Sequence, residues 1–410
     1  MKNYLTIAIK VLTRRKFFTF ISLFGIALTL FVLVVATAIA DNVFAPGGPE
    51  AKFGRVLCVY TIGRYGTEGG QTSPPGLGFL DRWVRTLPDV ERVSAFSTLQ
   101  TTAVYQEGRR VDAMMRRTDG GYWRILEYRF LEGHPFTAQD DASRRLVAVI
   151  SDSLREKLFG TAKAEGRSIN VDGNVYRIVG VVKRVSITRT AGFADVWVPN
   201  SALGSADQRR QFMGDYQGIV LAHSRADFPR LRREFATRLK TIPVDDPRFP
   251  EVRAGLDTTF EAVARLIVGN NVDRCAQILR TILIGAAILF MTLPALNLVT
   301  INLSRILERS SEIGVRKAFG APRSSLMTQF VVENLVLTLI GGAIGFAVSA
   351  VAIPVLNASG IIPNIQLALN LRIFAWGLAI AAFFGLFSGV YPAWRMARVD
   401  PVHALRGGAL

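Results

Sequence analysis

The chain has 410 residues, 50% of them hydrophobic, and its 49 Lys and Arg outnumber its 32 Asp and Glu, for a net charge of +17. This length allows one sizeable soluble domain together with a small membrane bundle. The charge does not indicate nucleic-acid binding, because no basic stripe is interleaved with aromatic residues. We attribute it to membrane topology and to attraction towards anionic lipid headgroups.

Residues 1–16 carry five positive charges and no acid, and they predict a short amphipathic helix on the cytoplasmic face of a membrane. Residues 17–40 then form a run of 24 residues without a charge. A transmembrane helix needs ~20 apolar residues, so this run predicts the first span. A secretory signal peptide is the alternative, since Ala38-Ile39-Ala40 resembles a cleavage site. The run exceeds the roughly 7–15 residues usual in signal peptides, so we favour an uncleaved anchor.

Residues 41–272 predict a large, mixed α+β domain, with room for two lobes. The segment Ala45-Pro46-Gly47-Gly48-Pro49 ends the first helix. Alternating and apolar runs predict strands, and amphipathic runs predict helices. We expect strands at 55–62, 146–150, 168–171, 175–182 and 218–222, helices at 78–87, 153–159 and 227–240, and a loop at 67–78.

Three local signals in this domain are specific. Asp172-Gly173 between two strand-like runs predicts a tight hairpin. Ser151 or Asp152 caps the helix at 153–159, because either side-chain oxygen accepts the free N–H groups of the first turn. Residues 258–272 have a helical pattern and lead without a proline into the second span. They predict either a rigid rod that joins two compartments or a plain linker helix.

The last third of the chain holds three more apolar segments, which predict spans at 273–304, 326–355 and 373–394. Arg and Lys are frequent in the segment 305–325 and in the tail 395–410, whereas the short loop 356–372 has no charge before Arg372. Positive charge marks the cytoplasmic side. We therefore expect both termini and 305–325 in the cytoplasm, and 41–272 and the short loop outside it.

Glu333 lies well inside the third predicted span, and an ionisable residue at that depth is a functional candidate. A structural role, bonded to an arginine or the backbone near the interface, is the slightly favoured alternative. Gly341, Gly342 and Gly345 in the same span predict close helix approach, within the chain or along a dimer seam. Pro294 predicts a kink in the second span.

The sequence contains no recognisable catalytic motif. It has no Gly-Lys dipeptide and hence no P-loop for ATP. Its three histidines show no metal-ligand spacing. Cys58 and Cys275 are expected to be free, buried thiols. We therefore expect no enzyme activity, no metal site and no cofactor in this chain.

The segment between the second and third spans reads NLSRILERSSEIGVRKAFGAPRSSLMTQ. Glu308 and Glu312 lie one helical turn apart, as do Glu312 and Arg316. The pattern predicts a short charged helix with a sharp stop before Pro322. Such a helix is either a docking point for another protein or a solvated connector.

The part ERSSEIGVRKAFGAPRSSLMTQFVVEN resembles the cytoplasmic signature of the MacB/FtsX-type ABC transporter permeases, the type VII or mechanotransmission class. SGVYPAWRMARVDPVHALRGG resembles the fourth-span exit and tail of that family. FLEGHPFTAQD and VAVISDSLREKLFG, followed by GRSINVDGNVYRIVGVV, resemble its periplasmic domain. Together these stretches cover most of the chain.

The resemblance implies four spans with the large domain between the first and second, in the bacterial inner membrane. It implies a pair of identical or paralogous permease subunits and a separate cytoplasmic ABC ATPase dimer, which would bind ATP and Mg²⁺. A periplasmic adaptor is a further expected partner. The ATPase would dock on the coupling segment, of which we single out six residues: Glu308, Glu312, Arg316, Lys317, Gly320 and Ala321.

The implied function is ATP-driven export or extraction of amphiphilic cargo such as a drug, peptide, lipopeptide or lipoprotein. An FtsX-like regulator, which activates an outside enzyme without moving cargo, is the alternative. The outer domain at 41–272 is larger than FtsX-like ones and favours the first. A membrane-tethered enzyme or receptor without an ATPase is a third hypothesis.

Overall fold

The computed structural model describes residues 13–14, 16–67, 69–202, 208–244, 246–269, 274–289, 292, 323–361, 365, 367–372, 374–383 and 386. The chain divides into two compact units. We call Met1–Ala40, Ile282–Ser359 and Leu367–Leu410 the helical unit. We call Asp41–Thr281 and Gly360–Gln366 the α+β unit.

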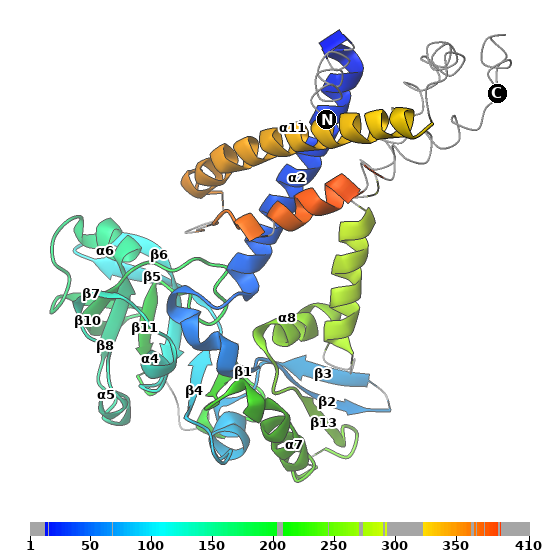
Figure 1. Ribbon diagram of the computed structural model, residues 1–410. Helices are drawn as coiled ribbons and strands as arrows, with labels where there is room; N and C mark the ends of the chain where they lie inside the picture. The colour runs from blue at the N-terminus through cyan, green and yellow to red at the C-terminus, as the bar shows by residue number, and fades with distance from the viewer. Residues whose placement is uncertain are drawn as a thin grey trace. The chain divides into compact units, whose positions relative to one another are not determined.

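Two described helices are long and apolar enough to cross a membrane: α2 (Lys16–Phe44) and α11 (Arg323–Ala358), both visible in Figure 1. They contain the predicted first and third spans. The predicted second and fourth spans extend beyond the described residues. Their described parts are shorter apolar helices, at Cys275–Leu289 and Phe374–Phe383. The predicted helix at 1–16 lies almost wholly outside the described residues, and Pro294 lies outside them.

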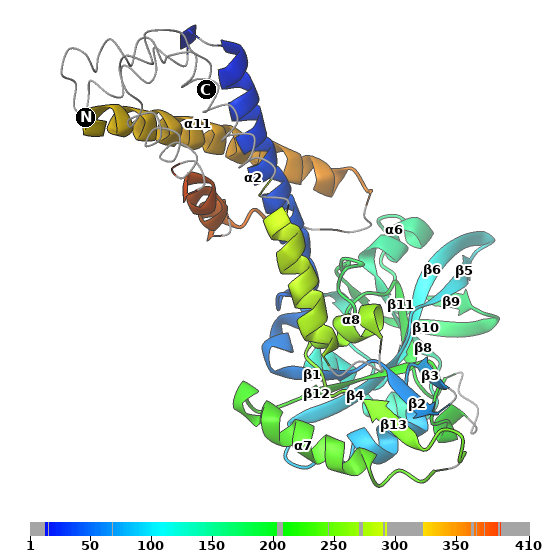
Figure 2. The same ribbon diagram turned by 90° about the vertical axis from the view of Figure 1, so that its right-hand side faces the viewer.

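Small residues let α2 and α11 approach each other within the helical unit, and Figure 2 shows the two helices crossing. A Cβ atom added to Gly341 would lie 2.8 Å from Ile26 Cγ2. One added to Gly345 would lie 3.0 Å from the Ala27 carbonyl oxygen. These contacts confirm the predicted close approach, and they occur within the chain.

A ten-stranded sheet frames the α+β unit. Its neighbour order is β1-β12-β4-β6-β11-β8-β10-β9-β5, with β7 on β10. Because β5 also pairs with β6, the strands β6, β11, β8, β10, β9 and β5 close into a ring. The bounds are β1 Val56–Val59, β4 Arg92–Ser97, β5 Gln100–Gln106, β6 Arg109–Thr118, β7 Phe130–Gly133, β8 Val147–Ser151, β9 Ser168–Val171, β10 Asn174–Val182, β11 Val196–Pro199 and β12 Tyr216–Leu221.

A second, antiparallel sheet of three strands has the order β13-β2-β3. Figures 1 and 2 show this sheet and α7 at one end of the α+β unit and the strand ring at the other. The strands are β2 Ile62–Gly66, β3 Gly69–Ser73 and β13 Glu251–Ala254. The helical segments are η1 Gly48–Arg55, α3 Leu77–Phe79, η2 Leu80–Val84, α4 Tyr122–Ile125, α5 Ala138–Ala142, α6 Asp152–Phe159, η3 Gln208–Arg210, η4 Arg225–Asp227, α7 Phe228–Leu239 and α8 Thr259–Val268.

Separate cores support the two ends of the α+β unit. The ring encloses apolar side chains such as Ile150, Ile178 and Val196, which are fully buried. The other end is built around Phe79, which lies on α3, and Leu231, which lies on α7. The strands and helices of this unit confirm the expected mixed α+β domain.

Several local predictions are confirmed. Asp172 and Gly173 adopt φ values of 47° and 81°, the left-handed region that a tight hairpin turn needs, and they join β9 to β10. Ser151 rather than Asp152 caps α6, because its hydroxyl accepts the Leu154 N–H at 3.1 Å. Cys58 and Cys275 are free and buried.

Two predictions are wrong, and a third is wrong only in its boundary. The expected loop at 67–78 contains β3, whose glycines and threonine are held by pairing with β2 rather than by burial. The expected strand at 55–62 is divided between β1 and β2, which belong to different sheets. The helix predicted at 258–272, as either a rod or a linker, is present as α8 but ends before residue 272, because Gly269 adopts a φ of 118°, a conformation that breaks a helix.

Candidate functional site

The six predicted ATPase-docking residues, Glu308, Glu312, Arg316, Lys317, Gly320 and Ala321, lie outside the described residues. Glu333 is described. It belongs to α11 and is 4% exposed.

Glu333 is part of a buried polar stripe on α11 that sequence reasoning missed. Gln329 lies one turn before it, and Thr338 lies just over one turn after it; both are buried, as is Asn334. Thr338 donates its hydroxyl to the Asn334 carbonyl oxygen at 2.9 Å, so its polar group is satisfied along the helix. Polar groups are costly in lipid, and a stripe of them faces protein or water rather than lipid. The spacing of four residues between Gln329 and Glu333 was the available signal.

The C-terminal end of α2 is fixed inside the α+β unit by a buried polar network. Thr188 donates its hydroxyl to the Asn42 side chain, and Arg189 donates to the Ala45 carbonyl oxygen. Glu50 accepts the N–H groups of Ala191 and Gly192, both at 3.0 Å. These bonds attach the residues that follow the first span to the loop preceding β11. We call this network the α2 anchor.

Burial is the largest electrostatic effect on Glu50 in the α2 anchor. Burial raises the pKa of Glu50, while the Gly192 N–H and the guanidinium of Arg189 favour its charged form. The Arg189 Nη1 atom lies 3.8 Å from the Glu50 carboxylate. A carboxylate that accepts two backbone N–H groups beside a guanidinium is well supported despite its burial.

Phe260 on α8 lies between the two chain segments that connect to predicted spans. Its ring packs edge-on against Phe44 at the end of α2, with centroids 5.2 Å apart. The Arg280 guanidinium, on the helix Cys275–Leu289, lies 5.8 Å from the same ring. Ala264 of α8 also packs with Cys275 and Leu279. Both segments therefore contact α8.

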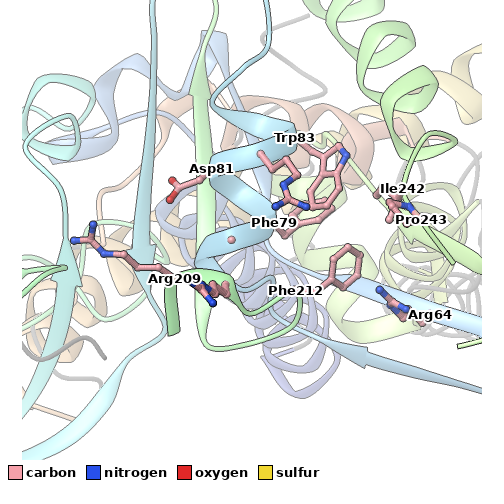
Figure 3. A pocket seen from close by; sticks show the side chains of 11 residues that line it. Arg64, Phe79, Asp81, Trp83, Arg209, Phe212, Ile242 and Pro243 are labelled. Carbon is pink, nitrogen blue, oxygen red and sulfur yellow. The ribbon is translucent and has the colours of Figure 1, made fainter. Parts of the chain in front are cut away.

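A cavity of about 530 Å³ lies at the α7 end of the α+β unit (Figure 3). Two glycines, Gly78 in the lining and Gly76 beside it, allow the backbone of residues 209–212 to approach closely. A Cβ on Gly76 would lie 2.1 Å from the Gln211 carbonyl oxygen, and one on Gly78 would lie 2.7 Å from that of Arg209. The Gly76 N–H also donates to the Phe212 carbonyl oxygen at 2.8 Å. Residues 209–212 are thereby held against α3.

Three aromatic rings form the apolar surface of the cavity. Phe79 lies 5.5 Å from Trp83 and 5.3 Å from Phe212, and Trp83 lies 5.8 Å from Phe212, all between ring centroids. Figure 3 shows the three side chains gathered together, with Ile242 and Pro243 nearby. Phe79 is fully buried, so the cluster is anchored in the core.

Four arginines surround the rings: Arg64, Arg82, Arg209 and Arg210. The Arg64 guanidinium lies 4.3 Å from the Phe212 centroid, and that of Arg82 lies 5.3 Å from the Trp83 centroid. Asp81 is the one acid among the lining residues that the structure describes, and it accepts a 2.7 Å hydrogen bond from Arg85. The cavity therefore combines an apolar surface with excess positive charge.

The sequence alone provides no indication of this cavity. Its residues come from β2, the α3–η2 turn, residues 209–212 and the chain after α7. No segment alone carries the pattern, and only the fold brings them together.

Comparison with known families matches the two parts of the chain separately. The MacB-like periplasmic core domain matches residues 19–238, and the FtsX-like permease C-terminal domain matches residues 284–401. This chain belongs to the MacB/FtsX-type ABC transporter permease family. Proteins of this family are transporter permeases that work with an ATPase, and a membrane location follows from the family and the apolar helices.

Similar curated relatives are ABC transporter permeases. The chain is 24% identical over 323 residues to the uncharacterized ABC transporter permease YknZ of Bacillus subtilis, covering 79% of this chain and 77% of that one. It is 25% identical to the macrolide export ATP-binding/permease protein MacB of Pasteurella multocida, over 72% of this chain and 43% of MacB. It is 25% identical to the pyoverdine export ATP-binding/permease protein PvdT of Pseudomonas fluorescens, over 97% of this chain and 58% of PvdT.

The chain thus spans less than two thirds of the MacB and PvdT relatives, which are named as combined ATP-binding and permease proteins. Similar solved structures include the extracellular domain of YknZ, with a TM-score of 0.37 and 16% identity over 48% of this chain and 98% of that one. The periplasmic region of MacB from Actinobacillus actinomycetemcomitans has a TM-score of 0.38 and 11% identity, over 54% of this chain and 96% of that one.

Within this permease family, the α2 anchor and Phe260 lie where the periplasmic core domain joins the predicted spans. The aromatic cavity belongs to the core domain itself.

Proposed function

We propose that this permease couples ATP hydrolysis by a partner ATPase to movement of its α+β unit, and that this movement exports or extracts amphiphilic cargo. The chain combines a MacB-like core domain and an FtsX-like permease domain, and its sequence has no P-loop. Energy must therefore enter from an ATPase partner and leave as motion. The predicted coupling segment 305–325 is where we place the entry.

The observation that carries the mechanical part of the proposal is the double attachment of α8. Phe260 contacts Phe44 from one connecting segment and Arg280 from the other. The α2 anchor adds hydrogen bonds from Thr188 and Arg189. Rigid, packed elements transmit displacement because close-packed interiors deform little. A shift of the spans would thus be passed to α8 and to the loop before β11.

We further propose the bacterial inner membrane as the location, with both termini cytoplasmic and residues 41–272 outside the cytoplasm. Two permease subunits, identical or paralogous, would pair around an ATPase dimer, which binds ATP and Mg²⁺. A periplasmic adaptor is a further proposed partner. Lys and Arg placement supports this orientation.

Site-specific photo-crosslinking in native membranes tests the docking proposal. A crosslinker at Lys317 should capture a protein that peptide sequencing shows to carry the G-x-x-x-x-G-K-[ST] motif. One at Ile361, which is 75% exposed, should not. Substituting Glu312→Ala should lower the yield at Lys317, whereas Glu107→Ala should leave it unchanged. Capture of the ATPase at Ile361 alone would reverse the topology, and capture at neither position would contradict the partnership.

A second experiment tests the mechanical step. In vesicles that contain the permease and its ATPase, Phe260→Ala should lower cargo movement per ATP hydrolysed about tenfold, because α8 loses its contact with Phe44. ATPase binding should be unchanged. The matched control is Phe159→Ala, on α6 in the ring lobe. An equal loss in both variants would show a general folding effect and contradict the mechanical role.

A further inference from the structure

We propose that the aromatic cavity binds an amphiphilic organic anion, with a flat apolar part on the half-buried rings of Trp83 and Phe212, which Phe79 supports from the core, and a carboxylate, phosphate or sulfonate among the arginines. This inference goes beyond the proposed function, since it concerns ligand binding by the α+β unit and requires neither the ATPase nor transport. The lining residues that carry it are Phe79, Trp83 and Phe212, and Arg82, Arg209 and Arg210.

Size and shape suit a small organic molecule. Ligand sites typically occupy about 300–1,000 Å³, and the cavity has about 530 Å³. The three rings lie within 5.8 Å of one another between centroids, and Phe79 is fully buried. The apolar surface is therefore already formed, and a ligand need not order it.

The charge requires an anionic group. Arg82, Arg209 and Arg210 have no ion-pair partner among the described residues. Asp81 cannot neutralise them, because Arg85 already donates to its carboxylate at 2.7 Å. Figure 3 shows the Asp81 carboxylate directed away from the rings. Guanidinium groups bind carboxylate, phosphate and sulfonate oxygens with paired hydrogen bonds.

The arrangement also requires an apolar part next to the anionic group. Arg82 lies over the Trp83 ring and Arg64 over the Phe212 ring, so cation and apolar surface are adjacent. A stacked guanidinium keeps its outer N–H groups available while its face is covered. An inorganic anion would use the arginines alone and leave the Trp83 and Phe212 rings in water. A neutral aromatic molecule would leave the guanidinium groups of Arg82, Arg209 and Arg210 uncompensated.

Three probes separate these possibilities on the full-length protein in lipid nanodiscs, with binding measured by calorimetry. Naphthalene-2-sulfonate carries both features, naphthalene-2-sulfonamide has the same shape without the charge, and methanesulfonate has the charge without the rings. The sulfonate should bind at least tenfold more tightly than either of the others. Its affinity should fall as salt is added, because the arginines are exposed.

Single substitutions test the assignment to this cavity. Arg82→Gln and the double change Arg209→Gln with Arg210→Gln should each weaken sulfonate binding about tenfold or more. The matched control is Arg110→Gln on β6, an exposed arginine at the ring end. Trp83→Phe keeps an aromatic ring, and it should retain binding while removing the tryptophan fluorescence quenching that the naphthalene ring causes.

Several outcomes would overturn the proposal. Equal binding of sulfonate and sulfonamide would mean that the cavity recognises the shape of the ligand and not its charge. Equal losses in Arg82→Gln and Arg110→Gln would show attraction to the overall positive charge. Tight binding of methanesulfonate would indicate a simple anion site. Absence of sulfonate binding at millimolar concentration, with unchanged thermal unfolding of the protein, would leave the cavity without this role.

Discussion

Among the described residues, the helical unit exposes many large apolar side chains, whereas the α+β unit buries most of its own. In the α+β unit, Trp197 is fully buried and packs against Tyr128 at 5.3 Å between ring centroids. In the helical unit, Phe20 and Val351 are 66% and 67% exposed, while glycines occupy the helix contact. Water drives large side chains inward, whereas lipid does not, and in lipid close backbone approach holds helices together. Equivalent substitutions should therefore have different effects in the two units.

The largest effect is expected at Trp197. Trp197→Ala removes an indole that contacts Trp123 and Tyr128 and donates from Nε1 to the Tyr122 hydroxyl at 3.3 Å. The free energy of unfolding should fall by about 3–5 kcal/mol, measured by denaturant titration of the full chain in detergent. Val175→Ala, at a 57% exposed position, is the control and should change little. A small loss of unfolding free energy in Trp197→Ala would contradict the expected difference between the two units.

The next effect tests the helical unit. Gly341→Leu should destabilise the α2–α11 contact by about 2 kcal/mol, because a Cβ there lies 2.8 Å from Ile26. The readout is thermal unfolding in lipid nanodiscs. Val351→Leu places the same side chain at an exposed position and should leave the unfolding temperature unchanged. Equal effects of the two leucines would mean that α11 does not pack through its glycines.

A smaller effect depends on pH. Glu132 is half-buried, which alone would raise its pKa, but the N–H groups of Glu165 and Ala164 and the guanidinium of Arg155 lower it below the ordinary value of 4.5. The charged form therefore stabilises the folded state above about pH 4.5, and this contribution is lost as the pH falls through the folded value. Glu132→Gln should cost about 1 kcal/mol at pH 7. The difference from the native protein should shrink in acid; a difference independent of pH would contradict the assignment.

The smallest effect concerns closure of the ring. Thr102 on β5 donates its hydroxyl to Asp172 in the β9–β10 turn at 2.6 Å. Thr102→Val keeps the shape and removes this bond, so a loss of about 0.5 kcal/mol is expected. Hydrogen exchange of the β5 amides should increase more than that of β12. Uniform exchange across both strands would show that the bond does not act locally.

The sequence was sufficient for features determined by a few neighbouring residues. Asp172-Gly173 specified its hairpin, and Ser151 its helix cap, because turn geometry and capping are local. Gly269 was a readable stop signal that the helical pattern of 258–272 outweighed. Charge-free runs predicted the two long apolar helices α2 and α11, because lipid imposes a minimum length on a span.

Other features depended on distant segments and were not predictable. β3 is a strand only because β2 pairs with it. Arg116 reads as one of many surface arginines, yet it is buried and donates to the carbonyl oxygens of Phe193 and Ser97, both at 2.9 Å. The cavity around Trp83 likewise needs four separate segments. Residues that gain their role from tertiary neighbours leave no pattern in one sequence.

Closure of the six-strand ring has a consequence for self-association. A strand with a free side exposes unpaired N–H and C=O groups, to which a strand of another molecule can attach and begin an aggregate. Pairing of β5 with both β6 and β9 removes two such sides at once. A mutation that broke the pairing between β5 and β6 would thus expose the unpaired edges of two strands at once. The lobe would then change abruptly from soluble to aggregation-prone.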